Sequence, residues 1–284
     1  MNLAHLLART ARVCPERPAV ALGEGESVSY GELFRRAAAT AGCLRSALRL
    51  RTGDRVALFM ANRPRYLELL YGIWHAGLVA VPINNKLHAR EVAFILENSA
   101  ASLLFVAGDP NDDWRLWCAS AAGLRIISVD DPESLRLTSG EPIAVVPRAP
   151  EDLAWLFYTS GTTGQPKGVM LSQRNLLAMT LAYFPDVDQA TPADSIVYAA
   201  PMSHGAGMYN FAHVLVGARH VVPASGGFDP HEILSLARRF GQVSLFAAPT
   251  MVRRLVDHVA DHGADCSGIK TIVYGGGPMY IEDI

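Results

Sequence analysis

The stretch that decides the fold is Trp155-Leu-Phe-Tyr-Thr-Ser-Gly-Thr-Thr-Gly-Gln-Pro-Lys-Gly-Val-Met-Leu171, in which a loop of glycines and hydroxyls lies between two apolar runs. The runs at 155–158 and 169–171 predict short buried strands, because apolar, aromatic and β-branched residues are bounded there by turn residues. The glycines let a ligand approach backbone N–H groups, the hydroxyls add donors, and a lysine adds a cation. The pattern predicts a loop that binds nucleotide phosphates through Thr159, Ser160, Gly161, Thr162, Thr163, Gly164 and Lys167.

Two other interpretations of this loop are weaker. A Walker A loop does not fit, because Lys167 follows Pro166 and no Ser or Thr comes next to hold magnesium. A flexible hairpin with a surface lysine would be favoured for a generic glycine-rich loop. The complete signature between two strands argues against that plain reading.

The segment from Tyr158 to Gly168 closely resembles the phosphate-binding signature of the AMP-forming adenylating superfamily, which contains acyl-CoA synthetases, luciferases and peptide-synthetase adenylation domains. Weaker landmarks at 52–56, 80–84 and 228–230 match in order, so the likeness extends over essentially the whole chain. The resemblance implies an α/β fold of two lobes, each a largely parallel sheet flanked by helices. The expected lobes are about 50–185, ending in the phosphate loop, and 186–284 together with 1–49.

Composition narrows the class of protein. The chain has 284 residues, half of them hydrophobic, and a formal net charge of -2, which predicts a soluble globular protein with a large core. Without a basic excess, nucleic acid is not an expected partner. The four cysteines form no Cys-x-x-Cys pair, so neither a zinc site nor a disulfide framework is indicated, and the cytoplasm fits best. No apolar run is long enough to span a bilayer.

Strands and helices alternate along the chain. Strand 55–60, helix 64–77 and strand 78–82 form a β-α-β unit that continues toward the loop, and the segment 131–150 predicts an irregular connection within the domain. A second series follows, with strands at 195–199, 218–222, 243–247 and 270–274 and helices near 208–215, 230–240 and 251–262. Alternation of this kind predicts parallel sheets whose ligands gather at the carboxyl ends of the strands.

Two further stretches follow strands of the second series. The first, Pro201-Met-Ser-His-Gly-Ala-Gly-Met-Tyr209, holds a histidine that residue chemistry alone would assign to the core. The resemblance implies instead that His204, Gly205 and Met208 line the substrate pocket. Relatives often have an aromatic residue before that histidine, where this chain has Ser203.

The second stretch is Tyr274-Gly-Gly-Gly-Pro-Met279, in which bare backbone would let a flat adenine ring lie against peptide groups. Alone it would be a tight turn. The resemblance implies an adenine-binding segment formed by Gly275, Gly276, Gly277 and Pro278.

A third pattern is declined as a metal site. His258 and His262 share a helix face at the spacing of a zinc motif, but Val259 stands where a metalloprotease needs its glutamate.

The reaction implied by the resemblance is ATP-dependent activation of a carboxylic acid to an acyl-adenylate, followed by transfer to coenzyme A, as in fatty acid metabolism. ATP, Mg²⁺ and coenzyme A are the expected cofactors and co-substrates, with Thr162 as the hydroxyl nearest the metal and Lys167 ordering the loop. The catalytic lysine of the family is expected in a further C-terminal domain, so we interpret the chain as a fragment that binds nucleotide weakly and turns over negligibly. No catalytic residue is assigned within it.

Three functions compete at this stage. The first is the N-terminal part of an acyl-CoA synthetase. The second is an acyl-AMP ligase, a luciferase or an adenylation domain that passes the acyl group to a carrier protein. The third is a non-catalytic nucleotide-binding or scaffold protein, and a homo-oligomer is compatible with each of them.

Overall fold

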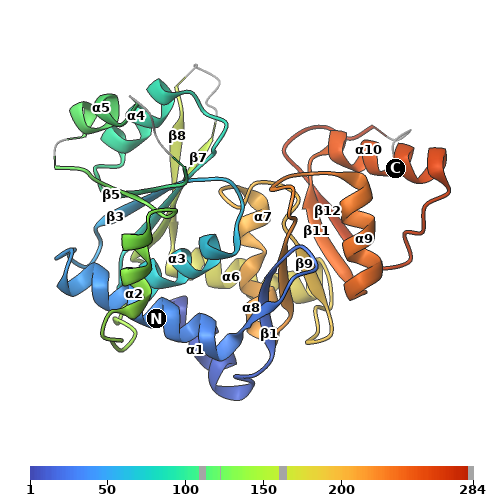
Figure 1. Cartoon of the computed structure of the whole chain (residues 1–284), viewed down its shortest axis with the longest axis horizontal. Coiled ribbons are helices and arrows are strands. Elements are labelled where there is room, and N and C mark those ends of the chain that lie inside the picture. The colour runs from blue at the N-terminus through green and yellow to red at the C-terminus, as the bar shows by residue number, and fades with distance from the viewer. Residues whose placement is uncertain (109–112, 122, 160–164, 281–284) are drawn as a thin grey trace. The chain divides into compact units, whose positions relative to one another are not determined.

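The computed structural model describes residues 1–108, 113–121, 123–159 and 165–280, in which helices and strands alternate (Figure 1). The chain divides into two compact units. Unit 1 comprises Met1–Ala8, Glu32–Ala61 and Arg65–Ala178, and unit 2 comprises Arg9–Gly31, Asn62–Pro64 and Met179–Ile284. Each unit holds one sheet of six strands, which confirms the predicted α/β class.

The sheet of unit 1 has the strand order β6-β5-β3-β4-β7-β8. Its strands are β3 (Arg55–Phe59), β4 (Val79–Ile83), β5 (Ala101–Val106), β6 (Arg125–Ser128), β7 (Leu153–Thr159) and β8 (Lys167–Ser172). Neighbouring strands are parallel except for β8, which runs antiparallel to β7. The predicted strands on both sides of the phosphate loop are therefore present as a hairpin.

Helices cover this sheet because their apolar faces match its apolar side chains. They are α3 (Pro64–His75), α4 (Ala89–Asn98) and α5 (Asp113–Ser120), and the ends of α1 (Ala4–Val13) and α2 (Tyr30–Ser46) fall on either side of unit boundaries. Val92, Ile95 and Leu96 of α4 pack with strand residues in one buried cluster. Trp74 of α3 lies 5.9 Å from Trp155 of β7, ring centre to ring centre, and its indole N–H donates to the carbonyl of Ala154 at 2.9 Å.

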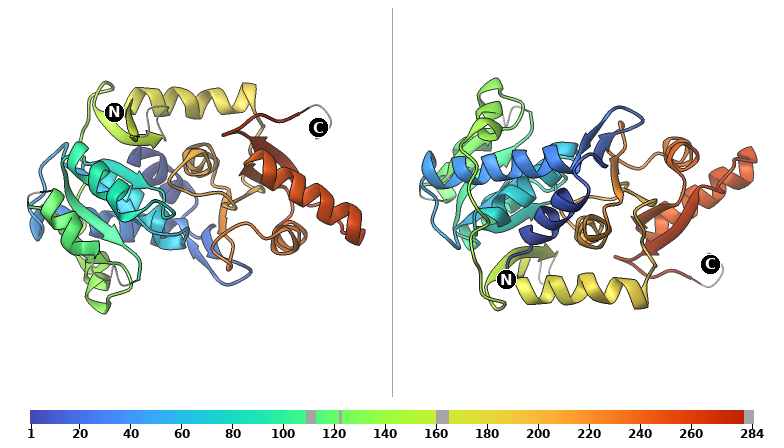
Figure 2. Two further views of the ribbon diagram at one scale, coloured as in Figure 1. Left: turned by 90° about the horizontal axis from the view of Figure 1, so that it is seen from above. Right: turned by 90° about the horizontal axis from the view of Figure 1, so that it is seen from below.

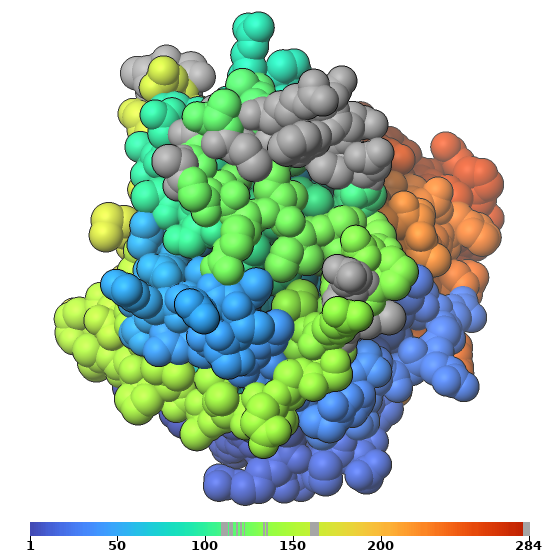
Figure 3. All heavy atoms as spheres, turned by 60° about the vertical axis from the view of Figure 1, so that its left-hand side comes forward, coloured from blue at the N-terminus to red at the C-terminus, as the bar shows by residue number. Residues whose placement is uncertain are grey.

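The connection 131–150 is ordered against unit 1, as predicted. It begins with the 3-10 helix η1 (Pro132–Ser139), and its later part hydrogen-bonds to the end of α3: the imidazole Nε2 of His75 lies 2.7 Å from the carbonyl of Ile143, and Val146 donates to the carbonyl of His75 at 2.9 Å. The carbonyl of Glu141 lies where a side chain at Gly42 of α2 would begin. Figure 3 shows this yellow-green stretch on the surface beside the light blue of residues near 50.

The sheet of unit 2 has the strand order β12-β11-β9-β10-β1-β2. Its strands are β1 (Pro18–Leu22), β2 (Ser27–Ser29), β9 (Ser195–Val197), β10 (Arg219–Val222), β11 (Val243–Ala247) and β12 (Ile269–Tyr274). Only β2 runs antiparallel to its neighbour, β1. Since β1 pairs with β10, the sheet joins residues near 20 to residues near 220.

The helices of unit 2 include α8 (Asn210–Val216), α9 (Pro230–Phe240) and α10 (Pro249–His262), and α6 (Gln173–Asp186) crosses the unit boundary. Figure 2 shows α9 and α10, in orange and red, beside each other. Helix α9 begins after Asp229, whose carboxylate accepts from the N–H of Glu232 at 2.9 Å, and Pro230 suits its first position. Its apolar face, with Ile233 and Leu236, joins Leu245 of β11 and Leu255 of α10 in one buried cluster.

One local prediction is wrong. Strand β8 is not buried: Val169 is 46% and Met170 is 70% exposed, because β8 is the outermost strand of its sheet. The helix predicted near 208–215 is present as α8, and a short helix that was not predicted, α7 (Gly205–Met208), precedes it with Tyr209 between them. The apolar spacing runs through both segments and therefore does not register the break.

Candidate functional site

The predicted phosphate loop joins β7 and β8. Thr159 ends β7 and is paired with Lys167, the first residue of β8, and both are exposed. A hydroxyl and a cation therefore stand across from each other at the base of the loop, and both can contact an anion. The remaining predicted phosphate ligands, Ser160, Gly161, Thr162, Thr163 and Gly164, lie outside the described residues.

A glycine of the same hairpin has a packing role. Gly168 pairs with Tyr158, and a Cβ on Gly168 would lie 2.9 Å from the tip of the tyrosine ring. The Tyr158 hydroxyl donates to Asn98 Oδ1 at 2.7 Å, and burial raises its pKa. A tyrosine anchored in this way lies across Gly168, which explains a glycine there without any phosphate contact.

In unit 2, His204 lies at the start of α7, after the carboxyl end of β9. Its backbone is extended (φ -123°, ψ -152°), and its Nδ1 lies 2.9 Å from the hydroxyl of Ser203. Burial lowers the pKa of His204 below its ordinary value of 6.5, so the imidazole is neutral at pH 7. A neutral, half-buried imidazole offers hydrogen bonds to a ligand without adding charge.

Asn62 fixes the segment that leads to His204, and nothing in its local sequence indicates that role. Its side-chain Nδ2 donates to the carbonyls of Tyr198 and Ala200 at 2.9 and 2.8 Å, and its Oδ1 accepts from the N–H of Met202 at 2.8 Å. One amide side chain thus satisfies three backbone groups of irregular chain. Of the other predicted pocket residues, Gly205 opens α7 and Met208 ends it, half-buried.

The predicted adenine segment follows β12. Gly275 continues the ladder, with its N–H donating to the carbonyl of Ala247 at 3.2 Å. Gly276 has φ +85°, in the left-handed region that favours glycine, and no atom lies within 4 Å of where its Cβ would be. Gly276, Gly277 and Pro278 are exposed. Bare, accessible backbone of this kind can receive a flat ring.

Phe246 brings these two segments of unit 2 together. A Cβ on Gly205 would lie 2.9 Å from its ring, and a Cβ on Gly275 would lie 3.2 Å from it. Tyr209 stacks on the same ring at 5.9 Å between centres, with an interplanar angle of 27°. The structure thus places the histidine segment and the triple glycine against one phenyl ring at the carboxyl edge of the sheet. Phe246 was missed from the sequence, and only its position near the end of a strand could have suggested it.

The described residues contain no group of three or more His, Cys, Asp or Glu side chains that could hold a metal ion. His258 and His262 do share a face of α10, as predicted, with ring centres 4.3 Å apart. Cys14, Cys43 and Cys266 are free thiols. Among the helices in the described ranges, none combines the length and the apolarity that crossing a bilayer requires.

Known proteins are similar to this chain both in sequence and in fold. The family model described as AMP-binding enzyme matches residues 7–284. Feruloyl-CoA synthase of an Amycolatopsis species is 35% identical over 273 residues, which cover 95% of this chain and 53% of that protein. The fatty acid–[acyl-carrier-protein] ligase ScoC of Streptomyces coeruleorubidus is 30% identical, over 93% of this chain and 51% of that protein.

Among solved structures, ATP-bound MatB from Rhodopseudomonas palustris has a TM-score of 0.83 and 26% identity, and the match covers 100% of this chain and 56% of that one. The chain therefore spans about half the length of the curated relatives it matches.

Proposed function

Because the chain belongs to the AMP-binding enzyme family, we propose that it is part of an ATP-dependent acid–thiol ligase that activates a carboxylic acid and transfers it to coenzyme A. In the first step a carboxylate oxygen attacks the α-phosphorus of ATP, and the bond to pyrophosphate breaks. In the second step the sulfur of coenzyme A attacks the acyl carbon, the thiol loses its proton, and AMP leaves. Feruloyl-CoA synthase, at 35% identity, supports coenzyme A as the acceptor.

The observation that carries this proposal is the phosphate signature on the hairpin of β7 and β8. An acid anion must approach a polyanion, so donors that neutralise the phosphates lower the barrier. Thr159 and Lys167 are exposed at the base of the loop and suit this task. We assign the phosphates to Thr159, Lys167 and the residues 160–164, and we give Lys167 an ordering role.

Mg²⁺ is part of the proposal, because it accompanies ATP and binds mainly through phosphate oxygens and water. Thr162 is the protein hydroxyl that we expect beside it. The metal would supply charge neutralisation at the phosphates.

The edge of unit 2 around Phe246 supplies the proposed sites for adenine and acid. Gly276 and Gly277 leave backbone groups open on the exposed side, where we place the adenine ring with Gly275 and Pro278. We place the acid beside His204, Gly205 and Met208. The neutral imidazole of His204 would orient the acid by a hydrogen bond.

ATP binding tests the nucleotide assignments. Equilibrium dialysis with labelled ATP should show at least about tenfold weaker binding for Lys167→Ala and for Gly277→Val, since a charge-assisted contact and access to bare backbone are lost. Arg174→Ala is the matched control for the lysine: it also removes a positive charge from unit 1, from an exposed ion pair with Glu151. Equal binding by all four proteins, including the wild type, would contradict the assignments.

Pyrophosphate exchange tests the chemistry. The assay uses the full-length protein of which this chain is proposed to be a part. A panel of aromatic, short-chain and long-chain acids, begun with aromatic acids because of the feruloyl-CoA synthase relative, should reveal acid-dependent exchange. ATP binding by that full-length protein without exchange for any acid would favour a non-catalytic nucleotide-binding protein. Because the ScoC relative is named for an acyl-carrier protein, the acceptor test compares coenzyme A with a carrier protein. The cytoplasmic location and any homo-oligomer stay predictions, to be checked by cell fractionation and light scattering.

A further inference from the structure

A small cavity of about 190 Å³ lies at the amino ends of strands β1, β9 and β10 in unit 2. Its lining includes Arg17, next to the start of β1, Asp194 and Ser195 at the start of β9, and Arg219, the first residue of β10. His204 and Gly275 follow the carboxyl ends of β9 and β12, so the cavity belongs to the opposite edge of the same sheet. None of its residues lies in the segments proposed to bind ATP or the acid.

The two arginines of the cavity lack carboxylate partners. In the part of the chain that the structure describes, no acidic side chain lies within ion-pair distance of either guanidinium. Arg17 Nη1 donates to the carbonyl of Pro192 at 3.0 Å. Arg219 lies over the ring of Phe240, 4.7 Å from its centre, and its buried Nε has no hydrogen-bond partner among the described residues.

A third arginine adds to this positive charge. Arg239 stacks on the same Phe240 ring at 5.7 Å, and burial together with the charge of Arg239 lowers the pKa of Arg219. Arginine stays charged despite such a shift. The repulsion between these guanidiniums is therefore present in the folded protein, and an anion between Arg17 and Arg219 would reduce it.

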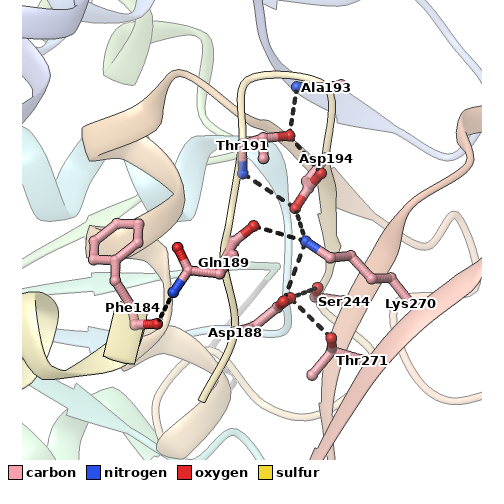
Figure 4. Close-up of polar contacts among 9 residues, drawn as sticks. All are labelled: Phe184, Asp188, Gln189, Thr191, Ala193, Asp194, Ser244, Lys270 and Thr271. Atoms are coloured by element: carbon pink, nitrogen blue, oxygen red, sulfur yellow. Dashed lines mark hydrogen bonds and ion pairs between the residues drawn. The ribbon is translucent and has the colours of Figure 1, made fainter. Parts of the chain in front are cut away.

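Asp194, the carboxylate that lines the cavity, does not neutralise the two arginines, because it is paired elsewhere. Asp194 accepts from Lys270 Nζ at 2.6 Å and from the Thr191 hydroxyl at 2.7 Å, and its side chain is only 2% exposed (Figure 4). Lys270 is also 3.2 Å from Asp188. The charged residues that line the cavity are therefore Arg17, Arg219 and Asp194, and the carboxylate of Asp194 is already paired with Lys270.

We propose that this cavity is a second ligand site, which binds a small, doubly charged oxyanion of the phosphate class between Arg17 and Arg219. Guanidinium groups hold phosphate oxygens by paired N–H donors, and the cavity volume of about 190 Å³ admits a phosphate group with water. Two arginines match the charge of a dianion better than that of a monocarboxylate. The site lies at the opposite ends of the strands of unit 2 from the residues proposed to bind adenine and acid.

Inorganic phosphate is the probe, titrated into the full chain by calorimetry at constant ionic strength. Arg17→Gln and Arg219→Gln should each weaken phosphate binding by at least about tenfold, since each removes a charge-assisted contact. Arg253→Gln is the matched control, because it removes the same charge from an exposed ion pair on α10 of the same unit. Acetate should bind far more weakly than phosphate. Lys167→Gln should leave this binding event in place, which separates it from the phosphate loop.

Three results would overturn the proposal: no phosphate binding by the wild type at millimolar concentration, an equal loss in Arg253→Gln, or a loss confined to Lys167→Gln. If Arg219→Gln does not fold, Arg17→Gln and Arg219→Lys still decide the matter. Arg219→Lys keeps the charge but loses the paired donors, so it should bind phosphate with intermediate affinity. Wild-type affinity in both of these variants contradicts the site.

Discussion

The two edges of the sheet of unit 2 differ in composition: glycines shape the carboxyl edge, and charged side chains shape the amino edge. At the carboxyl edge, glycines at 205, 207 and 275 leave room for an aromatic ring and for neighbouring backbone. At the amino edge, charged side chains reach across the strand ends, as Lys270 does toward Asp188 and Asp194 (Figure 4). The carboxyl edge depends on side chains being absent at its glycines, and the amino edge depends on ion pairs. We therefore expect added atoms to destabilise the carboxyl edge and removed charges to destabilise the amino edge.

The largest effect of adding atoms is expected at Gly207 of α7. A Cβ there would lie 1.8 Å from the backbone oxygen of Met202, an atom that cannot swing aside. Gly207→Ala should therefore lower the free energy of unfolding by about 3 kcal/mol, at the upper end for overpacking. Urea denaturation gives the value. Gly227→Ala is the control, because nothing lies within 4 Å of its Cβ position, and an equal loss in both variants would contradict the steric explanation.

Removing a charge at the amino edge should have the next largest effect. Asp188 accepts from the hydroxyl of Thr271 at 2.8 Å and from that of Ser244 at 3.2 Å, and it also contacts Lys270. Asp188→Asn should destabilise the protein by about 2 kcal/mol at pH 7, since hydrogen bonds to a charged group are lost. Asp257→Asn, in an exposed ion pair with Arg253, should cost far less.

The same variant gives a pH test. Burial alone would raise the pKa of Asp188, but the bonds from Thr271 and Lys270 outweigh it and hold the pKa below the ordinary value of 3.8. A depressed carboxyl pKa contributes stability that is fully present above pH 3.8 and is lost as pH falls through the folded value. The difference in the free energy of unfolding between wild type and Asp188→Asn should therefore become smaller below that pH. Carboxyl groups titrate down to roughly pH 2 to 3. A difference that stays constant down to that pH would argue against the carboxylate as its source.

Phe246 allows a double-mutant cycle at the carboxyl edge. Gly205→Ala places a Cβ 2.9 Å from the phenyl ring, and Phe246→Leu removes part of that ring. The alanine should cost about 1 kcal/mol less in the leucine background than in the wild type, because the smaller side chain relieves the contact. Unfolding of the four proteins measures this coupling. Additive effects within about 0.3 kcal/mol would show that the two residues are independent.

The smallest effects are expected in the exposed glycines. Gly276→Ala should cost about 1 kcal/mol, because φ +85° strains any residue with a Cβ even in open space. Gly277→Ala should change stability by less than about 0.5 kcal/mol, since its Cβ would meet only Pro249 at 3.9 Å and its φ is not in the left-handed region. Thermal unfolding of the pair separates backbone strain from crowding, and the opposite order would refute this separation.

Local patterns in the sequence predict the elements well. The helix at 230–240 and the strand at 243–247 have the predicted bounds, because periodicity, Pro230 and Gly241 all act within a few residues. Contacts between segments that are distant in the sequence could not be predicted in this way. The exposure of β8 depends on its place in the sheet, and the meeting of Gly205 and Gly275 on Phe246 depends on strand order. Arg17 and Arg219 likewise become neighbours of one cavity only because β1 lies next to β10.

That neighbour relation also constrains the order of events during synthesis. Val20 pairs with His220, so β1 and β2 leave the ribosome long before their partner β10 exists. A two-stranded hairpin is marginal by itself in water, and pairing over so long a stretch is slow. The first strands must therefore stay unpaired on one side while residues 30–218 are made. A nascent chain stalled before residue 219 would expose this edge to other chains, and a chaperone that shields residues 18–29 would act at the step where misassembly begins.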